Sequence, residues 1–597
     1  MITQNDMHIF SYKDESPTNT VNKIKDILKK YNVETTETWY ETNVPNCHIV
    51  VISANGTSFM TTGKGLTKEL ALASGYGEFM ERFQLGFIGR KDVQKDGNYS
   101  YNDVQSELIP ANQLLQQNPK WYSAFSDRLY IYTGKRYSPD ELVMQYADQD
   151  KNVICTPYYC ITADSKAYLP VALRKAVYTA SGCASGNTPE EAIVHAISEI
   201  MERYSLVRIS AEKITPPDIP EHVLKQFHYA YSIITYLRQH DYKVVVKDCS
   251  LGNKYPVISI CIINKKNGRY HTHYGADPVL EIAIERALVE PFQGRNIHDV
   301  TKHIDFASRP DSRLDVKNLQ TEIVWGAAEK PYFFFTGEPT FQYNENMGLS
   351  GSNNRELFNE CIKYFKDMGY DVLVRDGSCL SFPTYQVVIP GYSEVACHRL
   401  DPDYQESKDL PKVANILKDL SAASFDDMLL VAQYIGKTSE SFSKLTGLHL
   451  NIDNSEDNYL KYSSIAYLDY SLMQFSTAAH IIDILLNFSK KEHEDYLICL
   501  KRYLTLIDQG CAPAAIKDIL LYFHQPQTVE KLYFYIDSSK NPFDDFILHC
   551  DMNCTENCLV YNHCCKEYVS NLVNLINQKT KLLDFDKFAD KIRSLVN

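Results

Sequence analysis

Two short segments of this chain, 121 positions apart, carry the same acidic and basic residues in the same order. The matched residues are Glu78, Glu81 and Arg82 in the first segment and Glu199, Glu202 and Arg203 in the second. Residues three and four positions apart lie on one face of a helix, so each segment presents two carboxylates and one guanidinium to the same side. Two like charges about 4 Å apart repel by roughly 4 kcal/mol at an effective dielectric of 20. If the two faces meet, they therefore require a cation between them.

The residue types indicate which cation this is. Oxygen ligands without His or Cys favour Mg²⁺ over zinc, and Mg²⁺ commonly binds protein carboxylates on one side and phosphate oxygens of a substrate on the other. The two arginines have the planar donor geometry that suits phosphate. The alternative is an ordinary solvated helix face with internal ion pairs. Duplication at matched positions favours a shared site for a divalent cation and a phosphate.

The segments that precede the two helices favour the same interpretation. Each helix follows a glycine-containing turn and a threonine cap, which are Gly63-Lys64-Gly65 and Thr67 in the first copy and Ser185-Gly186-Asn187 and Thr188 in the second. Glycine before a helix start lets a ligand approach the unpaired amides, and Lys64 adds a positive charge there. Pro189 and Glu191 complete a capping box in the second copy. Glu191 is therefore expected to cap the helix, with metal binding as the alternative.

Extended runs joined by a turn precede each helix, which predicts a repeated hairpin-plus-helix unit. The predicted strand pairs are 47–54 with 57–62, 158–162 with 167–171, and 257–263 with 270–274. The first pair flanks Asn55-Gly56, a strong hairpin signal. The third unit continues into a helix from Pro278.

The third helix is a degraded copy of the first at an offset of 212 positions. Ala283, Glu290 and Gln293 fall on Ala71, Glu78 and Glu81 in this alignment. Pro291 directly follows Glu290 and is expected to kink this helix. Glu290 is therefore a further candidate for the charged site, in a less regular helix.

The pattern of elements predicts an α+β fold followed by a helical domain. Helical periodicity leads into a strand twice, from 221–239 to 242–248 and from 355–368 to 370–376. We expect a first domain at 1–396 with antiparallel sheets, a polar linker at 397–412, and a helical domain at 413–597. Segments 478–488, 493–506 and 514–523 look like short paired helices, as in a tetratricopeptide-like (TPR-like) array, although no clean 34-residue repeat is present.

Composition limits the partners and the location. The net charge of -14 argues against direct binding to nucleic acid or to an anionic membrane and favours a basic protein or peptide. No apolar run approaches the roughly 20 residues that span a bilayer, and residues 1–16 lack the apolar core of a secretory signal. We expect a cytoplasmic location.

Three other sequence patterns could indicate a phosphate-binding or metal site. Gly436-Lys437-Thr438 resembles the end of a phosphate-binding loop, but its first glycine is replaced by Val431, so we reject it. His271 and His273 alternate along a predicted strand, for which an exposed strand face is the expectation and a metal site the alternative. The cluster Cys550 to Cys565, with His549 and His563, has no iron–sulfur or zinc-knuckle spacing. Reduced structural cysteines are the expectation there, and metal or redox use the alternative.

These motifs, taken together, resemble the three nucleotide-site motifs of the YcaO family. The matching residues are Gly63-Lys64-Gly65 through Ser74, Glu78, Glu81 and Arg82, then 181–188 through Glu199, Glu202 and Arg203, and then Glu285-Arg286 through Glu290, Gln293 and Arg295. Pro45-Asn46, Tyr255-Pro256-Val257 and 388–391 are similar to stand-alone bacterial members of that family, which also have a helical carboxy-terminal region.

The resemblance implies ATP and Mg²⁺ as cofactors. It places Mg²⁺ on Glu78, Glu81, Glu199 and Glu202, with Glu191 and Glu290 as further candidates, and nucleotide on Lys64, Ser74, Arg82, Arg203, Gln293 and Arg295. It assigns no catalytic residue. The implied reaction phosphorylates the oxygen of a peptide backbone amide while a nucleophile attacks its carbonyl carbon. Such chemistry consists of positioning and charge neutralisation for phosphoryl transfer.

The resemblance also separates several roles. Azoline-forming members end in a proline-rich tail, whereas this chain ends Lys591-Ile-Arg-Ser-Leu-Val-Asn597, and no leader-binding domain is evident. Stand-alone members are linked to methylthiolation of a small-subunit ribosomal protein as accessory factors to a radical methylthiotransferase, a role that suits an acidic protein with a basic substrate. The alternatives are a peptide-modifying enzyme that forms thioamides, amidines or azolines, and a non-catalytic ATP-binding adaptor. We expect a homodimer, because an antiparallel sheet edge can pair subunits.

Overall fold

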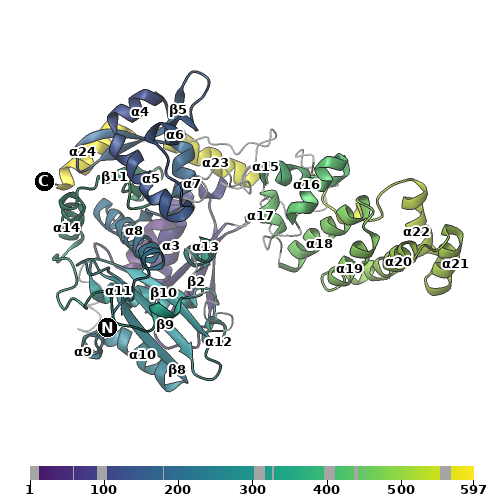
Figure 1. Ribbon diagram of the computed structural model, residues 1–597, viewed down its shortest axis with the longest axis horizontal. Coiled ribbons are helices and arrows are strands. Elements are labelled where there is room, and N and C mark those ends of the chain that lie inside the picture. Colours follow the sequence, from purple (N-terminus) through teal and green to yellow (C-terminus); the bar gives the residue numbers. More distant parts are fainter. Residues whose placement is uncertain are drawn as a thin grey trace.

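The computed structural model describes residues 13–57, 59–89, 104–178, 180–301, 316–325, 328–395, 410–435, 441–448, 450, 452, 454–550 and 566–596. Within these residues the chain forms a body that contains the named strands and an arm of helices that projects from one side of it (Figure 1). No helix in this part of the chain is long and apolar enough to cross a membrane.

Three strand–helix units form the centre of the body. They are β3 (Met60–Gly65) with α3 (Lys68–Gln84), β7 (Cys183–Ser185) with α8 (Pro189–Glu212), and β10 (Tyr270–Ala276) with α11 (Leu280–Val289). Each helix packs on its own strand and also on the strand of another unit, α3 on β7, α8 on β10 and α11 on β3. The three units therefore close into a ring, and their helices face a common centre.

Small residues at matched positions set the distance between strand and helix in each unit. A Cβ atom on Gly63 would lie 2.0 Å from the carbonyl oxygen of Ala71, and one on Gly275 would lie 2.6 Å from that of Ala283. Gly65 and Gly186 form a second matched pair, at which a Cβ would lie 2.6 Å from the amide of Ala71 and 2.8 Å from the amide of Ala192. The repeated alanines are fully buried. The sequence repeat therefore preserves the close strand–helix contact as well as the charged residues.

The strands form three antiparallel sheets. One contains β1 (Thr35–Tyr40), β2 (His48–Ala54) and β3, and another contains β8 (Tyr242–Asp248), β9 (Val257–Asn264) and β10. The largest contains β4 (Glu107–Pro110), β5 (Asn152–Cys160), β6 (Ser165–Pro170), β11 (Leu373–Asp376), β12 (Thr384–Val388) and β7. The predicted α+β class with antiparallel sheets is confirmed.

The remaining helices of the body pack mainly on these sheets, on the three central helices or on one another. They are α2 (Pro17–Lys30), α4 (Ala111–Gln117), α5 (Pro119–Thr133), α6 (Pro139–Met144), α7 (Val171–Val177), α9 (Glu221–Leu224), α10 (His228–Gln239), α12 (Ile297–Val300), α13 (Val316–Trp325) and α14 (Asn354–Asp367). In α14, Leu357, Cys361 and Phe365 recur every fourth position and are fully buried where the helix packs on α8. The two predicted helix-to-strand transitions are present as α10 to β8 and α14 to β11.

The hairpins differ from the prediction in two respects. The second strand of the first hairpin begins at Met60 instead of 57, because Thr57 bonds the carbonyl of Ala54 and the amide of Phe59 and holds those residues in a loop. In the second unit, α7 and β7 lie between the β5–β6 hairpin and α8. The strand that precedes α8 is thus β7, which pairs with the distant β12. A long-range pairing of three residues leaves no local signal in the sequence.

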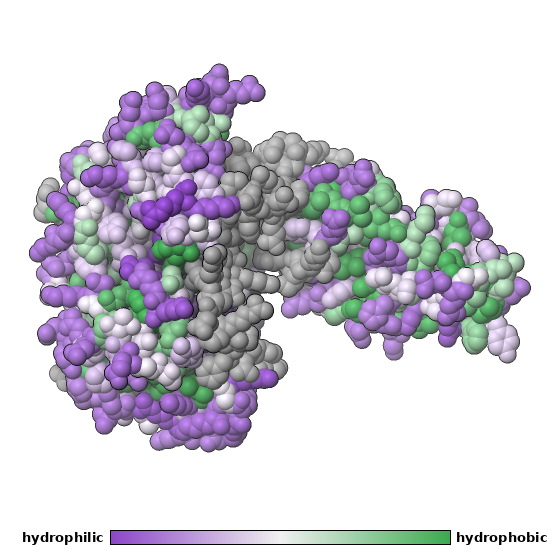
Figure 2. Space-filling view, viewed as in Figure 1, coloured by the Kyte–Doolittle hydropathy of each residue, from purple (hydrophilic) through white to green (hydrophobic). Residues whose placement is uncertain are grey.

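The arm consists of helices. They are α15 (Leu410–Lys418) and α16 (Phe425–Ile435) near the body, then α17 (Phe442–Thr446), α18 (Asn454–Ser471), α19 (Phe475–Leu485), α20 (Lys491–Asp508), α21 (Pro513–Phe523) and α22 (Pro526–Asp537). The helical carboxy-terminal region is therefore present, while its TPR-like character stays a prediction. The arm has its own core, and Figure 2 shows apolar surface along it. Tyr522 and Phe523 are 86% and 60% exposed on α21.

The last two helices, α23 (Lys566–Thr580) and α24 (Phe585–Val596), return to the body (Figure 1). Leu572 and Ile576 of α23 belong to the core cluster that contains Phe83 of α3. Phe588 of α24 stacks on Tyr385 of β12, with ring centroids 5.9 Å apart. The arm is thus connected to the body at both of its ends. The domain limits 1–396 and 413–597 stay a prediction.

Replacing Ile592 by alanine tests whether α24 stabilises the body. Ile592 is fully buried in the same core cluster as α8 and α14, so we expect the substitution to lower the free energy of unfolding by about 2–4 kcal/mol. Urea unfolding followed by tryptophan fluorescence measures this, because all three tryptophans of the chain lie in the body, in β1, α5 and α13. Leu582→Ala, at a position that is 76% exposed between the two helices, is the control, with an expected change within about 0.5 kcal/mol. An unchanged Ile592→Ala transition would contradict the docking of α24.

Glu394 is a buried carboxyl that makes the stability of the body depend on pH. Its Oε1 accepts hydrogen bonds from the Gly391 amide and the Tyr178 hydroxyl at 2.9 Å, while Oε2 has no partner among the residues that the structure describes. Burial raises the pKa of Glu394 to about 7. Between its ordinary pKa and pH 7 the folded state therefore holds more protons than the unfolded state, and stability falls as pH rises.

Glu394→Gln removes this titration. At each pH, the free energy of unfolding of the variant is compared with that of the wild type. This difference is expected to favour the variant more at pH 8 than at pH 5, by on the order of 3 kcal/mol. Urea unfolding of both proteins at the two pH values measures the difference. An effect of equal size at pH 5 and pH 8 would contradict the raised pKa.

Several predictions fall outside the described residues. They concern most of the linker at 397–412, the rejected loop Gly436-Lys437-Thr438, and Cys554, Cys558, Cys564 and Cys565 of the cysteine cluster. Cys550 is described and half-buried. The buried cysteines of the body, such as Cys155 and Cys361, lie in its apolar core, as expected of reduced thiols.

Candidate functional site

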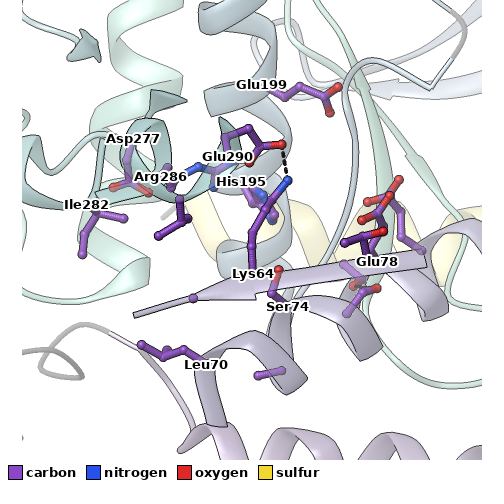
Figure 3. Close-up of a pocket in the computed structure, with 18 of the residues that line it drawn as sticks. Lys64, Leu70, Ser74, Glu78, His195, Glu199, Asp277, Ile282, Arg286 and Glu290 are labelled. Carbon is purple, nitrogen blue, oxygen red and sulfur yellow. Dashed lines mark hydrogen bonds and ion pairs between the residues drawn. The ribbon is translucent and has the colours of Figure 1, made fainter. Parts of the chain in front are cut away.

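A cavity of about 860 Å³ lies where α3, α8 and α11 face one another. All twelve residues predicted for the site line it, namely Lys64, Ser74, Glu78, Glu81, Arg82, Glu191, Glu199, Glu202, Arg203, Glu290, Gln293 and Arg295. Figure 3 shows Glu78 and Glu199 projecting from different helices, with the Lys64–Glu290 ion pair to one side of them. The structure therefore brings the three sequence repeats together at one place.

The cavity wall is layered, because each helix contributes residues at matched positions. Along the helices, one layer contains Ser74, His195 and Arg286, the next contains Glu78, Glu199 and Glu290, and the next contains Glu81, Glu202 and Gln293. Leu70 and Ile282 lie one turn before the first of these layers. One end of the cavity is thus lined by apolar side chains and Arg286. Next to it lie the two layers that contain the glutamates, which we call the carboxylate band.

Each arginine pairs with the carboxylates of its own helix. Arg82 lies 3.6 Å from Glu78 and 3.3 Å from Glu81. Arg203 lies 3.9 Å from Glu199 and 3.9 Å from Glu202, and it donates a hydrogen bond to the carbonyl of Ile323 at 3.0 Å. Contacts of 3.6–3.9 Å are too long for good hydrogen bonds. The carboxylates are thus neutralised from the side and remain accessible from the cavity.

Burial raises the pKa values of the two carboxyl groups on α8. The pKa of Glu202 is raised to about 7, because the charge of Arg203 offsets only part of the desolvation and Glu290 adds a like charge. Burial also raises the pKa of Glu199, against the effects of Arg203 and Arg82. A divalent cation in the cavity would stabilise the ionised form of both groups.

Lys64 extends from β3 across the cavity to the third unit. Its ammonium group forms an ion pair with Glu290 and lies 3.4 Å from the side-chain oxygen of Gln293 (Figure 3). Burial opposes ionisation of Glu290, but Lys64 and then His273 hold its pKa below the usual value. In the third repeat, Gly294 stands at the position that matches Arg82 and Arg203. Lys64 therefore neutralises Glu290, which lacks the arginine that accompanies Glu78 and Glu199.

The helix starts follow the prediction with one difference. The hydroxyl of Thr67 accepts from the amide of Leu70, and that of Thr188 accepts from the amide of Glu191, both at 3.2 Å. The carboxylate of Glu191, however, accepts from the amide of Asn187 at 3.0 Å and not from that of Thr188. Lys13 donates to the same carboxylate at 3.1 Å. The predicted capping box is thus only half formed, because Asn187 and Lys13 hold Glu191 beside the cavity.

The third helix is interrupted close to Pro291, where the sequence predicted a kink. The regular helix stops at Val289, and Glu290–Phe292 forms a single 3-10 turn that contains Pro291. Gln293 and Arg295 follow this turn and still line the cavity. Pro291 therefore redirects the chain without removing these side chains from the site.

His195 is a cavity residue that the predictions missed, and Arg286 is one that was placed in the third motif without a role. They occupy the positions of Ser74 in the second and third repeats, at offsets of 121 and 212. Extending the repeat alignment beyond the acidic residues would have found them. The pKa of His195 is lowered well below its usual value by burial and by the charges of Arg286 and Lys13. A neutral imidazole and a guanidinium therefore line the cavity at the repeat positions that match Ser74.

The expectation for His271 and His273 is wrong. His271 is 1% exposed, and His273 lines the cavity on the same strand face. The strand β10 packs its histidine face inward because α8 and α11 both cover it. Burial lowers the pKa of His273 to about 4, against the effect of the nearby Glu290. The alternation of the two histidines correctly predicted a strand, but it did not show that the histidine face of this strand is the buried one.

The donor set fits magnesium better than zinc. Glutamate oxygens from three helices surround the cavity, but no three His, Cys, Asp or Glu side chains in the described part of the chain lie close enough to hold a metal ion on their own. Mg²⁺ suits such an arrangement, because it usually keeps several waters and binds one or two carboxylates together with substrate phosphates. The residues present thus fit a magnesium ion that arrives with a phosphate ligand.

Comparison with known proteins identifies the class of this chain. A family model described as YcaO cyclodehydratase, ATP- and Mg²⁺-binding, matches residues 62–393, which is more than half of the chain. The chain therefore belongs to the YcaO family, whose cofactors are ATP and Mg²⁺, as the sequence motifs predicted.

Two curated relatives resemble the chain over most of its length. The ribosomal protein S12 methylthiotransferase accessory factor YcaO of Escherichia coli is 25% identical over 72% of this chain and 76% of its own. An uncharacterized protein of Haemophilus influenzae is 24% identical over 89% of this chain and 92% of its own. A solved heterocyclase in complex with substrate and cofactor is 20% identical, with a TM-score of 0.47 over 64% of this chain. The chain spans about half the length of that heterocyclase, 53%.

Proposed function

We propose that this protein is an ATP- and Mg²⁺-dependent activator of a peptide backbone amide that serves the methylthiolation of ribosomal protein S12. The observation that carries the proposal is the meeting of three repeated helices around one cavity, with carboxylates in a band and an arginine beside each of the first two pairs. A phosphoryl-transfer site needs positioning and charge neutralisation more than it needs a covalent catalyst.

Each group of residues has a distinct part in this proposal. Glu78, Glu81, Glu199 and Glu202 would hold the metal, which supplies charge neutralisation at the phosphates when bound. Arg82 and Arg203 lie beside these carboxylates, at 3.3–3.9 Å, and would offer their guanidinium groups to phosphate oxygens. Lys64, Ser74, Gln293 and Arg295 line the same cavity and would orient the nucleotide.

The proposed reaction uses the cavity to bring two substrates together. A nucleophile attacks the carbonyl carbon of the amide, the amide oxygen takes the γ-phosphoryl group of ATP, and ADP leaves. The chain would contribute orientation, because the polar groups that line the cavity converge from three helices.

The choice of partner rests on two supports. The E. coli relative is named for S12 methylthiotransferase, and the net charge of -14 suits a basic ribosomal protein. The radical methylthiotransferase is the proposed protein partner, and a homodimer is the proposed assembly. The apolar surface of the arm favours one second candidate, a non-catalytic ATP-binding adaptor that docks partners through its helices.

Phosphate release from ATP distinguishes the two candidates. With purified protein, Mg²⁺ and E. coli ribosomal protein S12, we expect S12 to stimulate phosphate release at least tenfold over the basal rate, with a mass change on S12 when a nucleophile such as sulfide is present. Binding of S12 without any stimulation would favour the adaptor. Phosphate release that responds to neither S12 nor any basic peptide would contradict amide activation.

A further inference from the structure

One hydroxyl group at the end of the cavity is buried without a partner among the described residues. Ser181 lies in the turn before β7, is 5% exposed and lines the cavity, and its Oγ makes no hydrogen bond to the part of the chain that the structure describes. Nearly all buried polar side chains in folded proteins are hydrogen-bonded, because an unpaired group loses its bonds to water. Such an exception beside a ligand cavity indicates a missing ligand atom.

The turn that carries Ser181 is fixed by its neighbour. Gly182 has a φ of +74°, and a Cβ atom there would lie 2.2 Å from the carbonyl oxygen of Val387 in β12. The amide of Val387 in turn donates to the carbonyl of Gly182 at 2.7 Å. Ser181 is therefore held in place by the sheet, so its hydroxyl is positioned before any ligand binds.

The position of Ser181 along the cavity follows from β7 and α3. The hydroxyl of Ser185 donates to the carbonyl of Gly77 at 2.6 Å, which aligns the strand with the middle of α3. Two residues earlier, Cys183 lies near Arg82. Burial lowers the pKa of Arg82, but nearby acidic groups raise it. Glu81 has the largest of these raising effects, and Cys183 is close enough to contribute as well. Ser181 and Cys183 thus line the end of the cavity that follows the carboxylate band.

The opposite end has different chemistry. Leu70 and Ile282 lie there, before the carboxylate band, with Lys13 bonded to Glu191. A triphosphate with its base against these apolar side chains would extend along the carboxylate band, so its last phosphate would lie towards Arg82 and Arg203. In that orientation the last phosphate would be the one next to Ser181.

We propose that the Ser181 hydroxyl donates a hydrogen bond to the terminal phosphate of bound ATP, and so makes the site prefer ATP to ADP. The inference rests on the proposed function, since it places MgATP in this cavity. It adds a residue outside the three repeated helices. Cys183, two residues further along the chain at the start of β7, lines the same end of the cavity and serves as a reporter for it.

The difference between ATP and ADP tests this inference. Titration calorimetry with the β,γ-methylene analogue of ATP and with ADP, both with Mg²⁺, gives the two affinities. We expect Ser181→Ala to weaken binding of the ATP analogue about tenfold and that of ADP less than twofold, because a hydrogen bond to a charged phosphate is lost only with ATP. Ser181→Thr keeps the hydroxyl and is expected to restore most of the affinity. Ser463→Ala, at a buried unpartnered serine in the arm, is the matched control and should change neither value.

Chemical labelling of Cys183 is the second measurement. We expect the magnesium complex of the ATP analogue to slow modification of Cys183 by methyl methanethiosulfonate at least fivefold more than MgADP does, as followed by peptide mass mapping. Equal losses of ATP and ADP affinity in Ser181→Ala, or equal protection of Cys183 by both nucleotides, would overturn the inference and leave the nucleotide site intact. A wild-type protein that binds neither nucleotide would overturn the proposed function as well.

Discussion

Replacing Glu199 and Glu202 together by glutamine is expected to lower the affinity for MgATP by at least about a hundredfold. Both carboxylates project from α8 into the cavity and lie 3.9 Å from Arg203. Glutamine keeps the size of the side chain but carries no charge, so the metal loses two anionic ligands while the packing of α8 is retained. Losing even an outer-sphere partner of a metal typically costs 10–100-fold in affinity, and losing two direct ligands is expected to cost more.

Titration calorimetry in excess Mg²⁺ measures this effect. The matched control is Glu212→Gln at the end of the same helix, where the carboxylate is exposed and accepts from Arg208 at 2.8 Å. The control is expected to bind MgATP within twofold of the wild type. If the double variant also bound MgATP within threefold of the wild type, the carboxylates of α8 would have no part in the metal site.

Replacing Gly63 by alanine is expected to disrupt the first unit of the ring. The added methyl group would lie 2.0 Å from the Ala71 carbonyl oxygen and 2.5 Å from the Gly75 amide, both of which belong to the backbone of α3. Neither atom can rotate away, so β3 and α3 must separate. Overpacking of this kind typically costs 1–3 kcal/mol and occasionally more, and we expect a loss of about 3 kcal/mol in the free energy of unfolding.

The same separation moves Lys64 relative to α3, since Lys64 follows Gly63 in the strand. We therefore expect Gly63→Ala to lower MgATP affinity at least tenfold even where the protein remains folded. Gly77→Ala is the control within α3, because its methyl group would meet only the Ser185 hydroxyl at 3.6 Å. That change is expected to be neutral or to stabilise the helix by about 0.5–1 kcal/mol. Urea unfolding and nucleotide titration of the two variants decide the matter, and equal behaviour would contradict the role assigned to the close strand–helix contact.

The repeat made most of the central fold predictable from the sequence. Identical residues at fixed offsets predicted α3 and α8 and their shared charged face, and Pro291 predicted an irregularity in the third helix close to where α11 ends. These features are local, since each depends on residues within one or two helical turns. The same reasoning applied to Ser74 would have predicted His195 and Arg286 as cavity residues.

The missing parts depend on contacts between distant segments. The strand before α8 is paired with β12, about 200 positions away, so the hairpin at β5–β6 was assigned to the wrong place in the second unit. His271 is buried because α8 and α11 cover β10, which the alternation of β10 alone does not reveal. An amphipathic pattern shows which face of a helix is apolar but not which core it will join. For this reason the return of α23 and α24 to the body was not predicted.

A crystal structure with Mg²⁺ and the β,γ-methylene analogue of ATP tests the central claim most directly. The account predicts the nucleotide between α3, α8 and α11, with magnesium about 2.1 Å from carboxylate oxygens of the glutamate band and with Arg82 and Arg203 turned from their glutamates to the phosphates. Nucleotide bound outside this cavity, with the two arginines still paired to Glu78, Glu81, Glu199 and Glu202, would contradict it.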